Sequence, residues 1–153
     1  MLTELMALLT CDELDVDELA ALVARIEAAP DDPELAFVEG ETPAEYMQIA
    51  VIREDFVMMS DRVDELHEQV SEQFAEPLPV FPNHRMPAPD YFRWLDEHLA
   101  GGKMPYELLL WGNPYDYDNL NAIVVRRADT ERILAIAAEL GLLVERAAQR
   151  RLT

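Results

Sequence analysis

The sequence predicts an α+β fold in which a helical, acidic N-terminal half packs with a small β-β-α-β sheet unit. In the first half, apolar residues recur at steps of three and four, the spacing of helices. Two unbroken apolar runs, Leu108–Leu110 and Ile123–Val125, are typical of central strands covered on both faces. A segment with five prolines, residues 77–89, separates the two patterns. We expect the 153 residues to form a single domain, with this segment as the best candidate for a subdivision.

The N-terminal half opens with three helix signals. Residues 2–10 predict a short apolar helix. Asp15 and Glu18 have the spacing of a capping box and predict the start of a second helix, which Pro30 ends. Thr42-Pro43-Ala44-Glu45 predicts a third start, since threonine is a good N-cap and proline suits the first helical position.

Residues 43–75 allow two interpretations. Apolar residues from Ile49 to Phe74 recur at helical steps, which suits one long helix or a coiled-coil seam. The continuous apolar run Phe56–Met59, followed by Ser60-Asp61, instead fits a helix, a short buried strand at about 55–60 and a helix at about 61–75. We favour the broken version, because a compact domain of this size rarely contains so long a helix.

The second half predicts extended backbone over residues 77–89, held against the fold by Val80, Phe81 and Met86. Asp90 is the expected N-cap of a helix that ends at Gly101-Gly102. The remaining expected elements, in chain order, are strands at Tyr106–Trp111 and Leu120–Arg126, a helix capped by Asp129 and ended by Gly141, a strand at Leu142–Val144, and a basic tail at Arg146–Thr153.

The charge of the chain is strongly asymmetric. The net charge is −19 and the pI is about 4.3. Residues 1–76 contain 21 acidic residues and three arginines, a net charge of −18, whereas residues 77–153 are close to neutral at −1. Such a field repels nucleic acid and anionic membranes and attracts basic surfaces. The simpler interpretation is a surface that only keeps the protein soluble.

The composition also indicates in which cellular compartment the protein is expected. No stretch approaches the roughly 18 apolar residues of a membrane span, and the first residues lack the basic region of a secretory signal. Cys11 is the single cysteine, which excludes an internal disulfide and a cysteine-based zinc site and fits a reducing compartment. We therefore expect a cytoplasmic protein, and the single lysine with abundant alanine suggests a bacterial one.

The residues do not predict catalysis, a cofactor or a metal. Cys11 adjoins Asp12-Glu13, and carboxylates raise the pKa of a thiol. Asp64 and His67 share a helical face but lack a further ligand at zinc spacing. The segment 116–120 begins like a calcium loop and then places a leucine at the fifth position. Because phosphate-loop and nucleophile motifs are also missing, we expect a protein that is not an enzyme.

Two features of the last third of the chain bear on possible binding partners. Arginines cluster in the last third of the chain, at Arg126, Arg127, Arg132, Arg146, Arg150 and Arg151. We expect them to pair with the acidic N-terminal half rather than with nucleic acid, which the net charge repels. In the predicted hairpin loop, the candidate partner-binding residues are Tyr115, Asp116, Tyr117 and Asp118. Tyrosine gives apolar contact and the acids select basic partners, unless one ring folds back on the sheet.

Residues 106–146 resemble the closing unit of several small acidic bacterial families of unknown function, some of them suspected toxin-immunity proteins. The likeness lies in the hairpin with its Asp-rich loop, in Asp129-Thr130-Glu131-Arg132 opening a helix, and in Gly141 before the last strand. It implies an immunity or inhibitor-type protein that binds a basic partner protein. Two alternatives stay open: a DNA mimic that occludes a nucleic-acid-binding surface, and a structural or regulatory domain that could form a homodimer through the 49–74 seam.

Overall fold

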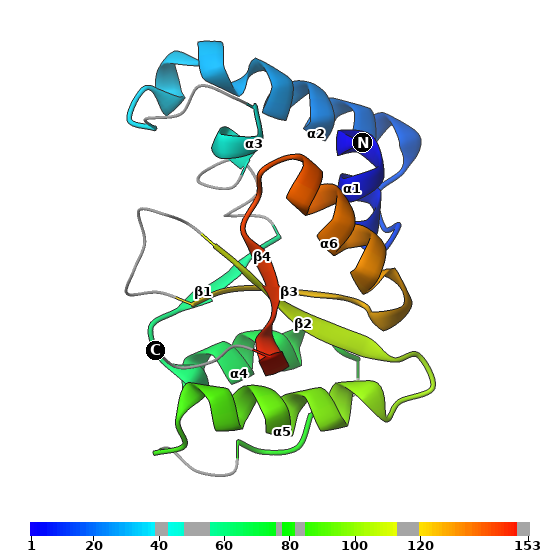
Figure 1. The fold of residues 1–153 in the computed structure, drawn as a ribbon, viewed down its shortest axis with the longest axis vertical. Helices are drawn as coiled ribbons and strands as arrows, with labels where there is room; N and C mark the ends of the chain where they lie inside the picture. Colours follow the sequence, from blue (N-terminus) through cyan, green and yellow to red (C-terminus); the bar gives the residue numbers. More distant parts are fainter. Residues whose placement is uncertain (39–42, 48–55, 76–77, 82–84, 113–119, 150–153) are drawn as a thin grey trace.

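The structure is a computed structural model that describes residues 1–38, 43–47, 56–75, 78–81, 85–112 and 120–149. Its strands form a four-stranded antiparallel sheet in the order β1-β3-β2-β4 (Figure 1). Their bounds are β1 Met58–Ser60, β2 Tyr106–Trp111, β3 Leu120–Arg126 and β4 Val144–Arg146. The α+β class is thereby confirmed, and both central strands have the predicted bounds.

Two crossing connections organise the sheet. The chain from β1 to β2 passes over β3, and the chain from β3 to β4 passes over β2. Each connection carries the chain two strand positions across the sheet, and both move toward the same edge of the sheet. The strands from which they start, β1 and β3, run in opposite directions. Connections of the same hand must therefore lie on opposite faces of the sheet. The helices follow this rule and cover both faces (Figure 1).

One face is covered by α1 (Leu2–Leu9) and α6 (Thr130–Glu139). The other is covered by α4 (Val63–Glu72) and α5 (Ala88–Ala100). The helix α2 (Val16–Ala28) packs on α1 and forms an outer layer, beside the short α3 (Pro43–Tyr46) (Figure 1). Single 3-10 turns complete the fold at Ala29–Asp31, Pro33–Leu35, Arg127–Asp129 and Ala147–Gln149.

The alternation of β2 separates two cores. Leu109 and Trp111 point to the α1/α6 face, whereas Leu108 and Leu110 point to the α4/α5 face. Because successive strand residues face opposite sides, an unbroken apolar strand fills both cores. The sequence prediction that these strands are covered on both faces is confirmed, with the side chains from Leu108 to Trp111 at most 4% exposed.

The interpretation of residues 43–75 as helix, strand and helix is confirmed in the described part. β1 ends at Ser60 and α4 begins at Val63, so the segment contains no single long helix. Most described members of the 49–74 stripe pack inward: Leu66 and Val70 are buried and Phe74 is partly buried in the same core, whereas Met59 is 37% exposed. These residues do not form an exposed seam.

Helix ends follow the local signals in most places. The capping box at Asp15 and Glu18 is present in both directions. Gly141 has a φ of 75°, the Gly141 N–H donates to Ala138 O, and the Leu142 N–H donates to Ala137 O. This is the Schellman pattern, and only glycine adopts such a φ without strain. Since the turn uses residues 141–142, the last strand begins at Val144 rather than at the predicted Leu142.

Three expectations need correction. Asp90 does not cap α5, because Pro89 is tolerated in a first helical turn and the helix begins earlier, at Ala88. Asp129 is at the N-cap of α6 but its side chain makes no capping bond. The expected tail is in its first part structured: Arg146 belongs to β4, and Ala147–Gln149 packs on α5.

The proline segment packs on the fold as predicted, with one exception. Phe81 and Met86 are partly buried in the α4/α5 core, whereas Val80 is almost fully exposed. Within the described part of the chain, no helix combines the length and the apolar surface that crossing a bilayer requires.

Candidate functional site

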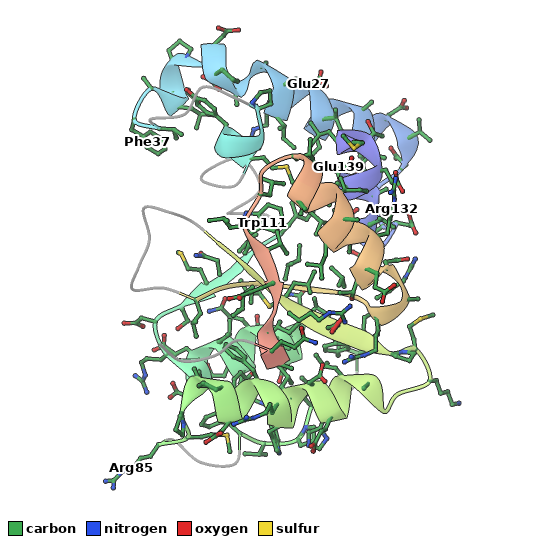
Figure 2. The ribbon with its side chains drawn as sticks, in the orientation of Figure 1. Glu27, Phe37, Arg85, Trp111, Arg132 and Glu139 are labelled. Atoms are coloured by element: carbon green, nitrogen blue, oxygen red, sulfur yellow. The ribbon has the colours of Figure 1, made fainter. Side chains whose placement is uncertain are left out.

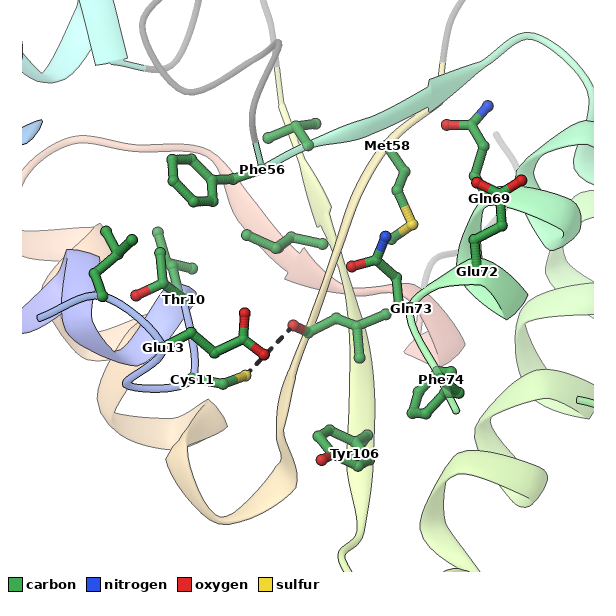
Figure 3. A pocket seen from close by; sticks show the side chains of 15 residues that line it. Thr10, Cys11, Glu13, Phe56, Met58, Gln69, Glu72, Gln73, Phe74 and Tyr106 are labelled. Atoms are coloured by element: carbon green, nitrogen blue, oxygen red, sulfur yellow. Dashed lines mark hydrogen bonds between the residues drawn. The ribbon is translucent and has the colours of Figure 1, made fainter. Parts of the chain in front are cut away.

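A cavity lies where β1 leaves the edge of β3 uncovered (Figure 3). Its volume is about 410 Å³. The turn after α1 forms one wall, and the C-terminal turn of α4 and the start of β2 form the opposite wall (Figure 3). Ile123 and Val124 of β3 complete the lining. The cavity therefore joins both faces of the sheet at one edge.

The strand pairing explains why this edge is open. β1 pairs with β3 only from Met58 opposite Ala122 to Ser60 opposite Leu120, and β3 continues four residues further, to Arg126. Polar groups of alternate residues in a strand point to alternate sides. Both backbone groups of Met59 bond to the Gln69 side chain, on the side of β1 away from β3. Met58 therefore bonds to Ala122, and the N–H and C=O of Val124 point to the same side as those of Ala122.

At Val124 this side contains no strand in the described part of the chain. The Cys11 thiol lies 3.9 Å from the Val124 oxygen, at the reach of a weak S–H···O bond (Figure 3). The described residues offer the Val124 N–H no hydrogen-bond acceptor. The cavity thus exposes one backbone donor and one weakly used acceptor of a central strand.

A strained turn holds Cys11 beside this edge. Cys11 and Asp12 have φ angles of 52° and 58°, which residues other than glycine rarely adopt. Arg126 fixes both: one guanidinium nitrogen donates to the Cys11 carbonyl at 2.7 Å and the other to the Asp12 carboxylate at 2.8 Å. The turn is therefore tied to the end of β3 by one side chain.

The cavity is negative and partly aromatic. Glu13 and Glu72 line it and are exposed, while lysine, arginine and histidine are missing from its described lining. Phe74 and Tyr106 stand edge to face with ring centroids 5.2 Å apart and form part of the α4/β2 wall. Such a lining favours a cation that carries an apolar stem.

The Cys11 thiol is not activated. Burial raises its pKa, and Glu13 and Asp129 act in the same direction, against the lowering effect of Arg126. The sequence predicted the neighbouring acids as the cause, whereas burial is the larger cause. A thiol whose pKa is raised is a poor nucleophile.

The structure gives His67 a structural role. Its Nε2 lies 2.8 Å from the Pro79 carbonyl and its Nδ1 lies 3.1 Å from the Tyr91 hydroxyl. A carbonyl only accepts, so Nε2 donates to Pro79, and Nδ1 is hydrogen-bonded to the Tyr91 hydroxyl. Both nitrogens are thereby used. Across the described ranges, no three His, Cys, Asp or Glu side chains are grouped as a metal site would need.

The late arginines pair with acids, but of the four that the structure describes only two pair with the N-terminal half, as predicted. Arg126 and Arg132 bind Asp12 and Glu4 of the N-terminal half. Two others bind acids of the C-terminal half: Arg127 contacts Asp96 and Glu107, and Arg146 contacts Glu107. These four guanidinium groups are engaged inside the protein; Arg150 and Arg151 lie outside the described residues.

The predicted partner-binding residues, Tyr115, Asp116, Tyr117 and Asp118, also lie outside the described residues, and their role stays a prediction. The cavity could not be predicted from the sequence, because its lining comes from five separate segments. One signal was available: the short apolar run before Ser60 cannot cover a seven-residue partner strand. Comparisons with protein-family models, with curated proteins and with solved structures found no match.

Proposed function

We propose that this protein is a non-enzymatic binding protein of the immunity or inhibitor type, whose acidic outer layer binds a basic partner protein. The observation that carries this proposal is the position of the uncompensated acids. Asp17, Glu27 and Glu34 are exposed on α2 and the turn after it, and none of them forms an ion pair with a described residue. Glu27 lies on the outer layer, far from the sheet (Figure 2).

The distribution of the cations supports the same conclusion. Arginines of the C-terminal half are engaged by internal acids, so they leave little positive charge to offset the outer layer. Other acids of the N-terminal half lie on α4, on the opposite face of the sheet, where Arg62 pairs with Asp64 and Glu65. Unpaired charge on the outer layer steers a basic partner toward this layer and raises the association rate.

The cavity supports binding rather than catalysis. Its thiol is held protonated by burial, and its exposed carboxylates are not paired with a positioned acid or base among the described lining residues. General acid–base chemistry requires such a pair with distinct environments. Recognition of a cationic group requires only the charge and shape that this lining supplies.

The test is affinity capture from a lysate of the source organism with three immobilised proteins. These are the wild type, the triple variant Asp17→Asn/Glu27→Gln/Glu34→Gln, and the control Glu97→Gln/Glu131→Gln/Glu139→Gln. The control removes the same charge from exposed positions of the C-terminal half. Capture is measured at about 0.05 and 0.15 M salt. At the higher concentration the electrostatic screening length is roughly 8 Å.

We expect wild type and control to retain one basic protein at both salt concentrations, and the triple variant to retain much less of it at the higher one. The retained protein should lose an activity of its own when the complex forms. Retention of no basic protein, or equal loss by both variants, would contradict the proposal.

A further inference from the structure

We propose that the cavity beside Val124 binds an extended segment of the partner, antiparallel to β3, with a lysine or arginine opposite Val124. This inference rests on the proposed function and names the part of the partner that this site recognises. The Val124 N–H, for which the described residues supply no acceptor, and the Val124 C=O, which accepts only a weak bond from the Cys11 thiol, are the donor and acceptor that an added strand would use.

The outer edge of β1 and the edge of β3 at Val124 differ in how their backbone polar groups are satisfied. On β1, the Gln69 side chain donates to Met59 O at 2.9 Å and accepts from Met59 N–H at 3.0 Å, which occupies both outward groups. Beside Val124, the described residues supply only the Cys11 thiol, a weak donor that a peptide N–H can replace. An added strand is therefore blocked along β1 and admitted at β3.

The alternation of the strands sets where a bound side chain would go. Val124 points to the α4/α5 face, with Phe74 and Tyr106. In a hydrogen-bonded antiparallel pair, the residue opposite Val124 places its side chain on that same face. It would lie along the Phe74–Tyr106 wall, near Glu72 of the same cavity. The residues on either side of it would point to the other face, where Cys11 and Glu13 line the cavity.

This arrangement selects a basic residue. The aromatic edge-to-face pair covers an alkyl stem and attracts a cation through its ring faces. Glu72 on one side and Glu13 on the other add negative charge, and the described lining supplies no basic side chain to oppose it. The volume of about 410 Å³ is at the lower end of the roughly 300–1,000 Å³ of ligand pockets, which suits a short segment.

The experiment uses three pools of acetylated, amidated tripeptides that contain Thr, Val, Ile and Ser at the two outer positions; a longer segment would overlap Met58, which pairs with Ala122. The centre is lysine in the first pool, glutamate in the second, and lysine with a methylated backbone nitrogen in the third. Each pool is titrated into ¹⁵N-labelled full-length protein up to about 1 mM total peptide. Amide shifts report binding at Val124 directly.

We expect the lysine pool to shift the amides of Val124 and Cys11, and both other pools to shift them at least several-fold less. N-methylation removes the donor to Val124 O, and glutamate reverses the charge. The variant Glu13→Gln/Glu72→Gln should weaken the lysine pool about fivefold, and the matched variant Glu97→Gln/Glu131→Gln by less than about twofold.

Several outcomes overturn the proposal. An unshifted Val124 amide at the highest concentration excludes an added strand. Equal shifts from the methylated pool show that the cavity takes a cation without backbone pairing, and equal shifts from the glutamate pool exclude charge selection. New contacts between copies of the chain, seen as concentration-dependent shifts at Val124 without peptide, assign the edge to self-association instead.

The two proposals fail separately. If a basic partner is captured through the acids of α2 while the lysine pool leaves Val124 unshifted, the proposed function stands and the cavity assignment is wrong. If the lysine pool binds at Val124 while no basic protein is captured, the cavity binds a peptide and the inhibitor-type function is wrong.

Discussion

The side chain of Gln69 occupies both backbone polar groups of Met59. Its amide nitrogen donates to Met59 O at 2.9 Å, and its oxygen accepts from Met59 N–H at 3.0 Å. These are the two bonds that an antiparallel neighbour would make. Gln69 thus acts as a one-residue strand on the outer edge of β1, and exposed edges are common sites of unwanted pairing.

Gln69→Leu should expose that edge and destabilise the protein. Two backbone groups lose their partners, and the cost should be about 1–2 kcal/mol, since water can reach part of the site. Urea unfolding measures it, with Gln73→Leu as a control one turn further along the helix region, where the side chain is exposed. If both variants unfold at the same urea concentration, the Gln69 bonds contribute no stability.

Much of the fold could be predicted because local signals decide it. The bounds of β2 and β3 followed from apolar runs between turn residues, and the start of α2 followed from the capping box at Asp15. The start of α5 was predicted three residues late, because proline can occupy a first helical turn as well as end a strand or loop. Such boundary errors come from rules that allow more than one position.

The candidate site could not be predicted, because it depends on tertiary pairing. The bare edge at Val124 exists only because β1 stops pairing at Met58, and no local pattern fixes where a strand pair ends. The left-handed turn at Cys11 and Asp12 contains no glycine or asparagine to indicate it. It is held by Arg126, which is more than 110 residues away in the sequence.

Glu107 should be the most costly carboxylate to remove. Its side chain is 3% exposed and lies 2.9 Å from Arg146 and 3.4 Å from Arg127. Glu107→Gln removes the charge that both guanidinium groups share, and we expect a loss of about 2–4 kcal/mol, because breaking a buried pair leaves its partners uncompensated. Urea unfolding tests this.

The matched control for Glu107 is Glu4→Gln, which breaks the exposed pair with Arg132 at 2.7 Å. Exposed pairs contribute little, so this variant should unfold close to wild type despite the shorter distance. An equal loss in both variants would mean that burial does not decide the strength of these pairs.

Alkaline pH should destabilise the protein through Tyr91. Burial raises the pKa of this phenol above its ordinary value of 10.0, so the folded state keeps the proton while the unfolded state releases it. The stability from this group is complete below about pH 10 and declines as the pH rises further. Tyr91→Phe should show a flatter decline of unfolding free energy above pH 10, with Tyr106→Phe as the control. Parallel curves for wild type and Tyr91→Phe would contradict this.

The turn at Asp12 allows a comparison of two small substitutions. Asp12→Gly and Asp12→Ala both delete the ion pair with Arg126, but only alanine is strained at a φ of 58°. Asp12→Ala should therefore be less stable than Asp12→Gly by about 1 kcal/mol. At Asp17, inside α2, the order should reverse, because glycine is the poorer helix former by about 0.5–1 kcal/mol. If the alanine variant is the more stable one at Asp12 as well as at Asp17, the turn is not strained.

The last prediction distinguishes the role of the acids on α2 from the role of Tyr115 and Tyr117, the predicted partner-binding tyrosines. Once a partner is identified, Asp17→Asn/Glu27→Gln should slow association and reduce its salt dependence, because long-range charge acts mainly on the encounter. Tyr117→Ala should instead speed dissociation, at a cost of about 1–3 kcal/mol if its ring is a contact of the interface. Surface plasmon resonance at two salt concentrations measures both rates, with Tyr115→Ala in parallel. Wild-type dissociation in both tyrosine variants would make the loop ordinary surface and leave the Val124 edge as the specific contact.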